Sequence, residues 1–345
     1  MRKLVFVTQQ VDPAHHALAA TVPMIRALAA HVDELVVLAD GAAEDSLPSN
    51  ARVRLFRDRH KVGRGLRFEA ALARELSPRP VGVVAHMCPI YAVLGAPLVR
   101  PLGIPLVLWF THWRASPTLR AAAALSSAVA SVDRRSFPLD SSKVHAIGHG
   151  IDLTEFPCRE RPAGEGGLRL LALGRYSPAK GLDVLLRALR RSLDRGLDVR
   201  LTVHGPTLSE LERKHRRHLL ALRDELGLGD KAELAAAVDR SQVPALLAAN
   251  DLLVNNMRAG APDKVVYEAA ASCVPVLASN PVFDTLLPDE LRFPRDDPAE
   301  LAARVADFAE RAPEDRAALG RNLRATVARE HSVESWAKGI LQLTR

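Results

Sequence analysis

The segment GRYSPAKG, Gly174 to Gly181, places two cations, Arg175 and Lys180, on either side of a turn. An apolar run typical of a buried strand precedes it at Leu168–Leu173, and an amphipathic run typical of a helix follows at Leu182–Arg195. Ligands of parallel α/β sheets bind beyond the carboxyl ends of strands, and a helix N-terminus flanked by cations favours a diphosphate. The segment therefore predicts an anion site at Gly174, Arg175 and Lys180; solvated loop cations are the alternative.

A second segment, Gly260–Asn280 (GAPDKVVYEAAASCVPVLASN), sets one carboxylate, Glu268, in an otherwise apolar helix. Asp263 is a good N-cap residue for that helix, and Pro275 forces an exit into a buried strand at Val274–Ala278. A carboxylate among small apolar residues is costly unless something pairs with it. Glu268 therefore either reaches water at a helix edge or faces a ligand.

Three histidines lie at expected strand ends or turns. His112 follows the apolar strand Pro105–Thr111, and His86 ends the strand Val81–His86. A histidine in such a position can hydrogen-bond a sugar hydroxyl or move a proton, although neighbouring backbone can satisfy it equally well. We expect a functional role for His112, a structural role for His86, and a turn at His149, which lies between two glycines.

The elements that must position these residues alternate between strand and helix along the whole chain. In the first half, strands are predicted at Leu4–Thr8, Leu35–Ala39, Val53–Phe56, Val81–His86, Pro105–Thr111, Ala128–Val132 and Val144–Ile147. In the second half they are predicted at Leu168–Leu173, Val199–His204, Ala232–Val238, Leu252–Asn255 and Val274–Ala278. Helical patterns include His15–His31, Arg64–Leu76, Leu182–Arg195 and Ser209–Leu226. This alternation predicts an α/β protein of two doubly wound parallel-sheet (Rossmann-like) domains, with the cleft between them as the default ligand site.

Composition and charge fit a soluble globular protein. The 345 residues are 48% hydrophobic and 25% charged, and the net charge of +7 falls within residues 1–150, which hold 18 Lys and Arg against 11 Asp and Glu. Only 4% of residues are aromatic, and no basic and aromatic residues interleave, so nucleic acid is not an expected partner.

The basic excess gathers between Arg52 and Arg74. Six further cations lie there against two acids, and Leu66, Ala70, Ala73 and Leu76 can share one helix face. A solvated basic helix is one interpretation. Peripheral contact with an anionic membrane or an acidic acceptor is the other.

The cysteines Cys88, Cys158 and Cys273 are odd in number, scattered, and not at metal-binding spacing. The start MRKLVFVTQQ is typical of a first strand rather than a signal peptide. Both features favour a reducing cytoplasm. Membrane contact through Arg52–Arg74 would place the protein at the inner face of the cell membrane.

Taken together, several segments resemble the retaining nucleotide-sugar glycosyltransferases of the GT-B fold, in the large family numbered four. They are IGHGID, LGRYSPAKGLDVLLRAL, LTVHGP and NDLLVNNMRAGAPDKVVYEAAASCVPVLAS, with weaker likeness in HMCPIY and LVLWFTHW. The resemblance implies an N-terminal acceptor-side domain at 1–155 and a C-terminal nucleotide-sugar domain at 156–330. The linker would be Pro157–Gly167, and residues 331–345 would form a last helix that returns to the first domain.

The resemblance also implies roles for matching residues. Arg175 and Lys180 would hold the donor diphosphate and neutralise the departing nucleotide, Glu268 would bind the ribose hydroxyls, and His112 would lie near the donor sugar. No metal, no cofactor and no protein nucleophile is expected. The sugar would pass from a nucleotide-diphosphate sugar to a hydroxyl of a glycan, glycolipid or natural product by front-face substitution with retention, the leaving phosphate helping to deprotonate the acceptor.

Three positions depart from the family pattern. Gly260 stands where a second carboxylate is usual, Cys273 stands where a glycine is usual, and TQQVDPAHH replaces a glycine-rich loop after the first strand. Asp263 could reach into the place of the missing carboxylate, and Lys264 could add a third cation to the diphosphate site. The alternative is that Asp263 only caps its helix.

Rival functions share the architecture. A nucleotide-sugar epimerase is one; a phosphorylase would carry a cofactor-lysine motif that the sequence lacks. A non-catalytic partner that binds a sugar nucleotide is another, supported by the missing carboxylate at Gly260 and opposed by the presence of Arg175, Lys180, Glu268 and His112.

Overall fold

The computed structural model describes residues 1–13, 15, 18–43, 47–158 and 167–345. Its contacts divide the chain into two compact units, described separately below. Unit 1 is Met1–Asp152 with Arg329–Arg345, and unit 2 is Leu153–Ala328. Most of the predicted linker, Pro157–Gly167, lies outside the described residues.

Unit 1 is built on a parallel sheet with strand order β3-β2-β1-β4-β5-β6-β7. The strands are β1 (Lys3–Val11), β2 (Glu34–Ala42), β3 (Ala51–Leu55), β4 (Gly82–His86), β5 (Leu106–Trp109), β6 (Ala128–Ser131) and β7 (Val144–Ala146). Apolar residues of the central strands are fully buried because helices cover both faces of the sheet. The strand order reverses between β1 and β4. Open parallel sheets bind ligands at such a reversal, beyond the carboxyl ends of the strands.

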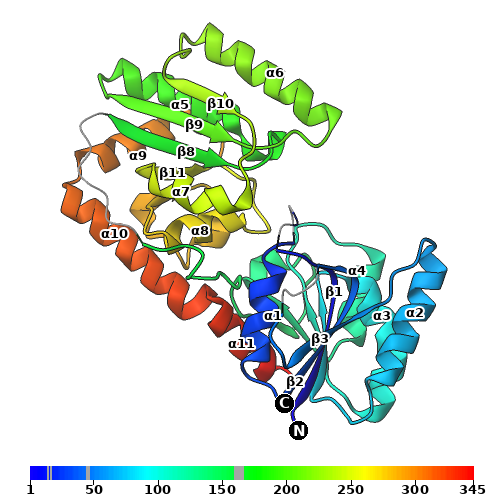
Figure 1. Cartoon of the computed structure of the whole chain (residues 1–345). Coiled ribbons are helices and arrows are strands. Elements are labelled where there is room, and N and C mark those ends of the chain that lie inside the picture. The colour runs from blue at the N-terminus through cyan, green and yellow to red at the C-terminus, as the bar shows by residue number, and fades with distance from the viewer. Residues whose placement is uncertain (14, 16–17, 44–46, 159–166) are drawn as a thin grey trace. The chain divides into compact units, whose positions relative to one another are not determined.

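Two helical layers enclose this sheet (Figure 1). One layer is α1 (Thr21–Ala29) with α11 (Val333–Gln342), and the other is α2 (Lys61–Arg74), α3 (Pro89–Val99) and α4 (Pro117–Leu125). The last helix is fixed to unit 1 by Trp336, which is fully buried and makes edge contacts with Phe6 and Trp109. The helix predicted at His15–His31 is shorter than expected, since α1 begins only at Thr21.

Unit 2 repeats the architecture with strand order β10-β9-β8-β11-β12, again parallel throughout the described pairs. Its strands are β8 (Leu168–Leu173), β9 (Val199–His204), β10 (Ala232–Ala235), β11 (Leu252–Asn255) and β12 (Val276–Ala278). Its helices are α5 (Leu182–Asp194), α6 (Glu210–Glu225), α7 (Val243–Ala248), α8 (Lys264–Ala271), α9 (Pro298–Glu310) and α10 (Pro313–Thr326). The reversal of strand order falls between β8 and β11, the strands that precede the two predicted site segments. The predicted fold class of two parallel-sheet α/β domains is confirmed.

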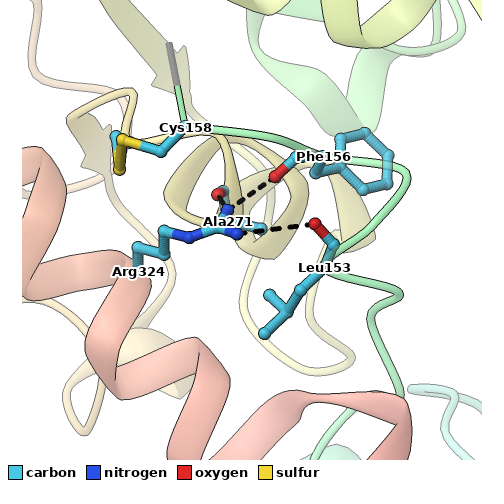
Figure 2. Close-up of a disulfide and its surroundings, with 6 residues drawn as sticks. Leu153, Phe156, Cys158, Ala271 and Arg324 are labelled. Atoms are coloured by element: carbon cyan, nitrogen blue, oxygen red, sulfur yellow. Dashed lines mark hydrogen bonds between the residues drawn. A yellow bond between two sulfur atoms is a disulfide. The ribbon is translucent and has the colours of Figure 1, made fainter. Parts of the chain in front are cut away.

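A disulfide between Cys158 and Cys273 ties the start of unit 2 to the end of α8 (Figure 2). Beside it, the Arg324 guanidinium of α10 donates to the carbonyl oxygens of Phe156 at 2.6 Å, Leu153 at 3.5 Å and Ala271 (Figure 2). The expectation of a reducing cytoplasm rests in part on the scattered cysteines, and it loses this support because two of them form a disulfide. Cys88 is buried and free.

Among the described residues, no helix has both the length and the apolar content needed to cross a bilayer.

Candidate functional site

The reversal point of the sheet in unit 2 brings Lys180 and Asp263 together. Lys180 follows β8 and Asp263 follows β11, and the Lys180 ammonium forms a salt bridge with Asp263 Oδ2. Asn255 Nδ2 donates to the same oxygen at 2.8 Å, and Lys180 Nζ donates to the Leu173 carbonyl at 3.3 Å. With side chains only 13% and 20% exposed, the two charges are held in a fixed arrangement at the carboxyl edge of the sheet.

Gly174 makes room for that arrangement. Its φ of +127° is one that L side chains rarely adopt, and a Cβ there would lie 2.4 Å from Lys180 Nζ. The glycine thus allows the lysine to fold back over the end of β8.

Arg175 is placed differently from Lys180. Its side chain is 57% exposed, and Nη1 lies 3.2 Å from Oε1 of the buried Glu212 on α6. Because more than half of the Arg175 side chain is exposed, its guanidinium can turn toward an anion, and the buried Glu212 then keeps the Leu208 amide as a hydrogen-bond donor at 2.6 Å. Of the two predicted cations, Lys180 is already fixed and Arg175 is the one with freedom to move.

Asp263 occupies the N-cap position of α8 with extended backbone, but its side chain makes no capping hydrogen bond. Its carboxylate turns to Lys180 and Asn255 instead. The interpretation that the Asp263 side chain only caps the helix is therefore wrong.

Glu268 lies on α8 and is 4% exposed, so the interpretation as a helix edge in water is wrong. Arg240 Nη1 donates to Glu268 Oε1 at 2.6 Å, and Lys264 Nζ lies 3.4 Å from the same oxygen. Arg240 also donates to both oxygens of Glu155, at 2.9 and 3.1 Å, and its guanidinium lies 4.9 Å from the Phe156 ring centroid. Two acids and two bases thus form one compensated cluster.

The environment shifts the pKa of both bases in this cluster. Burial lowers the pKa of Lys264 from its ordinary value, while the Glu268 carboxylate opposes that shift. Burial also disfavours the charge on Arg240, but Glu268 and Glu155 outweigh it and raise the pKa of Arg240. Lys264 pairs with Glu268, and its role as a third cation of the diphosphate site stays a prediction.

Gly260 has a φ of +117°, a backbone conformation that strains any L side chain. The loop conformation therefore disfavours a carboxylate side chain at position 260, because a glutamate could be accommodated only if the backbone changed.

The three histidines singled out in the sequence, His86, His112 and His149, all belong to unit 1. His86 is 4% exposed, stacks on Trp109 and shares a hydrogen bond with Thr8 Oγ1 at 3.2 Å, and burial lowers its pKa to about 3. His112 is partly exposed; its Nδ1 accepts from the Arg114 amide at 2.9 Å, and its pKa is lowered by burial and by Arg114. His149 is buried between Gly148 and Gly150, both with positive φ.

Sequence reasoning missed Arg240, Glu155 and Asn255. Asn255 ends a predicted strand and Arg240 follows one, so inspection of every strand end in unit 2 would have found both. Glu155 precedes the first strand of unit 2 and carried no such signal. No group of three or more His, Cys, Asp or Glu side chains in the described residues could hold a metal ion.

Comparisons with known proteins point to one family. Residues 159–326, just under half of the chain, match the family model of glycosyl transferases group 1. D-inositol 3-phosphate glycosyltransferase of Nocardia farcinica is 32% identical over 152 residues, which make up 41% of this chain and 33% of that protein. A second such enzyme, of Catenulispora acidiphila, is 32% identical over 157 residues, 42% of this chain and 36% of that protein. The matched parts make up about a third of the length of these relatives.

Solved structures extend the likeness over both units. Sucrose-phosphate synthase from Thermosynechococcus elongatus has a TM-score of 0.76 at 18% identity, covering 99% of this chain and 98% of that chain. Anabaena HepE in complex with UDP and glucose has a TM-score of 0.75 at 17% identity, covering 99% of each chain. The chain has the GT-B fold, and its second unit carries the sequence pattern of glycosyl transferases group 1.

Proposed function

We propose that this protein is a glycosyltransferase that moves a sugar from a nucleotide-diphosphate sugar to a hydroxyl acceptor with retention of configuration. The observation that carries the proposal is the Lys180–Asp263 pair at the strand reversal of unit 2, within the segment that matches glycosyl transferases group 1. The nucleotide sugar is the donor substrate, and the reaction uses neither a cofactor nor a metal ion.

Lys180 and Arg175 bind the diphosphate in this proposal. The Lys180 ammonium exchanges Asp263 for a phosphate oxygen, and Arg175 leaves Glu212 to join it, while the N-terminus of α5, which begins at Leu182, completes the anion site. Negative charge grows on the departing phosphate in the transition state, so both cations stabilise it more than the ground state. The same phosphate accepts the proton of the acceptor hydroxyl.

Glu268 and Asp263 orient the donor in this proposal. Both ion pairs of Glu268 use Oε1, so Oε2 is available to accept from ribose hydroxyls. Once Lys180 binds phosphate, the Asp263 carboxylate is released to bind hydroxyls of the donor sugar, in place of the carboxylate that Gly260 cannot supply. Lys264 acts through Glu268. A donor-sugar contact for His112 stays a prediction from the sequence.

The α2 region also supports peripheral contact with an anionic membrane. Val62 and Leu66 are 77% and 62% exposed, and Arg57, Arg59 and Lys61 beside them are exposed as well. The buried face of α2 is Phe68, Ala71 and Leu72, so the face predicted from Leu66, Ala70 and Ala73 is exposed. Cosedimentation should show binding to vesicles with phosphatidylglycerol and none to pure phosphatidylcholine; equal binding to both, or none, would end this part of the proposal.

The absence of a carboxylate at Gly260 favours one competing function, a partner that binds a sugar nucleotide without transferring it. A panel of nucleotide sugars, screened first by thermal shift and then for slow hydrolysis without acceptor, separates the two. Binding with hydrolysis supports the transferase, and NMR of the released sugar reports whether the α or β anomer forms first. Binding without hydrolysis across the panel would favour the partner, and exchange of the sugar's stereochemistry would favour an epimerase.

A further inference from the structure

The disulfide of unit 2 joins the two segments that carry the carboxylates of the buried cluster. Cys158 follows Glu155 in the first segment of the unit, and Cys273 follows α8, which carries Glu268. Arg240 connects the same two segments without a covalent bond, since it donates to Glu155 at 2.9 and 3.1 Å and to Glu268 at 2.6 Å. The disulfide therefore helps to keep Glu155 within reach of Arg240.

Cys273 ends α8 in a left-handed turn, with a φ of +58°. Glycine adopts this conformation without strain, whereas the Cβ of a cysteine makes it costly. Helix α10 passes so close to the turn that a Cβ at Gly320 would collide with the Cys273 carbonyl oxygen. The surrounding helices thus fix the backbone of the turn, and what the cysteine adds over a glycine is the sulfur that reaches Cys158.

The disulfide is accessible to a dithiol reductant, because Cys158 is exposed and Cys273 is half-buried. A thiolate of the reductant attacks the Cys158 sulfur, the S–S bond breaks, and Cys273 leaves as a thiolate that takes up a proton. The second thiol of the reductant then displaces Cys158, so the reductant is oxidised to its disulfide and both cysteines become thiols. Cys88 takes no part in this exchange, since burial raises the pKa of its thiol to about 12.

Arg324 ties the first segment of unit 2 to the end of α8 by hydrogen bonds. Its guanidinium donates to the carbonyl oxygens of Leu153, Phe156 and Ala271 (Figure 2). The Phe156 ring is also fully buried. These contacts remain when the disulfide is broken, so we expect unit 2 to stay folded while the position of Glu155 comes to depend on reversible contacts alone.

We infer that the Cys158–Cys273 disulfide is a redox site that tunes how unit 2 binds the ribose of a nucleotide, with Glu155 as the positioning residue. In the oxidised state Glu155 shares the guanidinium of Arg240, and Glu268 Oε2 is left for a ribose hydroxyl. In the reduced state Arg240 leaves Glu155 more often and pairs with both oxygens of Glu268, the geometry that guanidinium and carboxylate groups favour. Arg240 then competes with the ribose. The inference rests on the proposed function, which assigns the ribose to Glu268.

The test measures the affinity of the intact chain for UDP, GDP and ADP by calorimetry, before and after reduction with dithiothreitol. Alkylation and mass spectrometry count the free thiols in each sample. The 2′,3′-dideoxy form of the nucleotide that binds keeps the base and the diphosphate but has no ribose hydroxyls. Reduction should weaken binding of the ribonucleotide about threefold to tenfold and leave binding of the dideoxy form within about twofold. Unchanged affinity for the ribonucleotide, or equal losses for both forms, would overturn the inference.

Two variants separate the redox site from a general loss of stability. Cys158→Ser should bind both nucleotide forms as reduced wild type does, whatever the redox state. Glu155→Gln keeps the disulfide but removes the charge that holds Arg240, so it should weaken the ribonucleotide by the same factor, with no further loss on reduction. The matched control is Cys88→Ala, which keeps the disulfide and should respond to reductant as wild type does. A Glu155→Gln variant that binds like oxidised wild type, or that still responds to reductant, would contradict the inference even if Cys158→Ser did not fold.

The same titrations separate the redox site from the proposed function. Nucleotide binding that does not depend on the state of the disulfide would reject the redox site and leave the donor assignment intact. Absence of binding of UDP, GDP and ADP in both states would reject both.

Discussion

Arg240 Nη1 donates to Glu268 Oε1 over 2.6 Å, and the same guanidinium holds Glu155. The pair joins the segment after β10 to α8 and fixes the carboxylate that we assign to the ribose. Because Glu268 is buried, its charge depends on these partners. The arrangement presents one carboxylate oxygen in a fixed direction before any nucleotide binds.

Arg240→Ala should destabilise unit 2 by about 2 kcal/mol, because Glu268 loses one charge-assisted hydrogen bond and Glu155 loses two. Hydrogen exchange of the α8 amides measures this locally. The control is Arg190→Ala, which breaks an exposed pair with Asp194 and should cost less than about 1 kcal/mol. Equal losses in both variants would mean that the buried cluster contributes no more than a surface pair.

Asp263→Asn should separate sugar recognition from nucleotide recognition. The neutral amide still fits beside Asn255, so we expect the Kd for the nucleoside diphosphate to stay within about threefold while turnover of the nucleotide sugar falls roughly tenfold or more. Asp297→Asn is the matched control, since Asp297 caps α9 through the amides of Ala299 and Glu300. If affinity for the nucleoside diphosphate fell as much as turnover, or if turnover did not fall at all, the assignment of Asp263 to the donor sugar would be wrong.

The disulfide should matter for unit 2 as a whole. It closes a separation of 115 residues, and Cys158→Ser should lower the free energy of unfolding by about 2–4 kcal/mol. Hydrogen exchange with and without reductant provides the control, because reductant should destabilise wild type but leave the variant unchanged. A wild type that does not respond to reductant would show that the bond contributes little.

Acid should destabilise unit 1 through His86. Its folded pKa of about 3 lies below that of an unfolded histidine, so the stability it contributes is full above pH 6.5 and is lost as the pH falls toward 3. The slope should be about 1.4 kcal/mol per pH unit from this group. The three tryptophans, Trp109, Trp113 and Trp336, all lie in unit 1, so their fluorescence follows its unfolding by urea.

His86→Gln should flatten that slope between pH 6.5 and 5. The exposed His145 serves as the control, and His145→Gln should leave the slope as in wild type. An unchanged slope in His86→Gln would show that the histidine is protonated with little cost in the folded state.

Local sequence pattern predicted the sheets well, because a buried parallel strand is a short apolar run with clear ends. Leu168–Leu173 and Val199–His204 are strands in the structure with the predicted bounds. The apolar positions of His15–His31 suggested a longer helix than α1, whose first turn starts at Thr21. Helix ends depend on tertiary packing as well as on periodicity.

The site was predictable only where its residues follow strands. Lys180 and Asp263 could be placed on one sheet edge from their strands, but their direct pairing depends on β8 and β11 being neighbours, and strand order is not a local property. The meeting of Arg240 with Glu268 and of Cys158 with Cys273 depends on the same non-local arrangement. The φ of +58° at Cys273 gives a backbone reason for the glycine usual at that position, which the sequence alone did not supply.

The most direct test of the account is the affinity of Lys180→Ala for nucleoside diphosphates, measured by calorimetry beside Lys231→Ala. Lys231 pairs with Asp198 at the surface of the same unit and should behave as wild type. We predict that wild type binds at least one of UDP, GDP and ADP, and that Lys180→Ala binds it about tenfold to a hundredfold more weakly because a charge-assisted bond to phosphate is lost. A folded Lys180→Ala variant that binds the same nucleotide as tightly as wild type, or a wild type that binds none of the three, would contradict the assignment of a nucleotide-sugar site to unit 2.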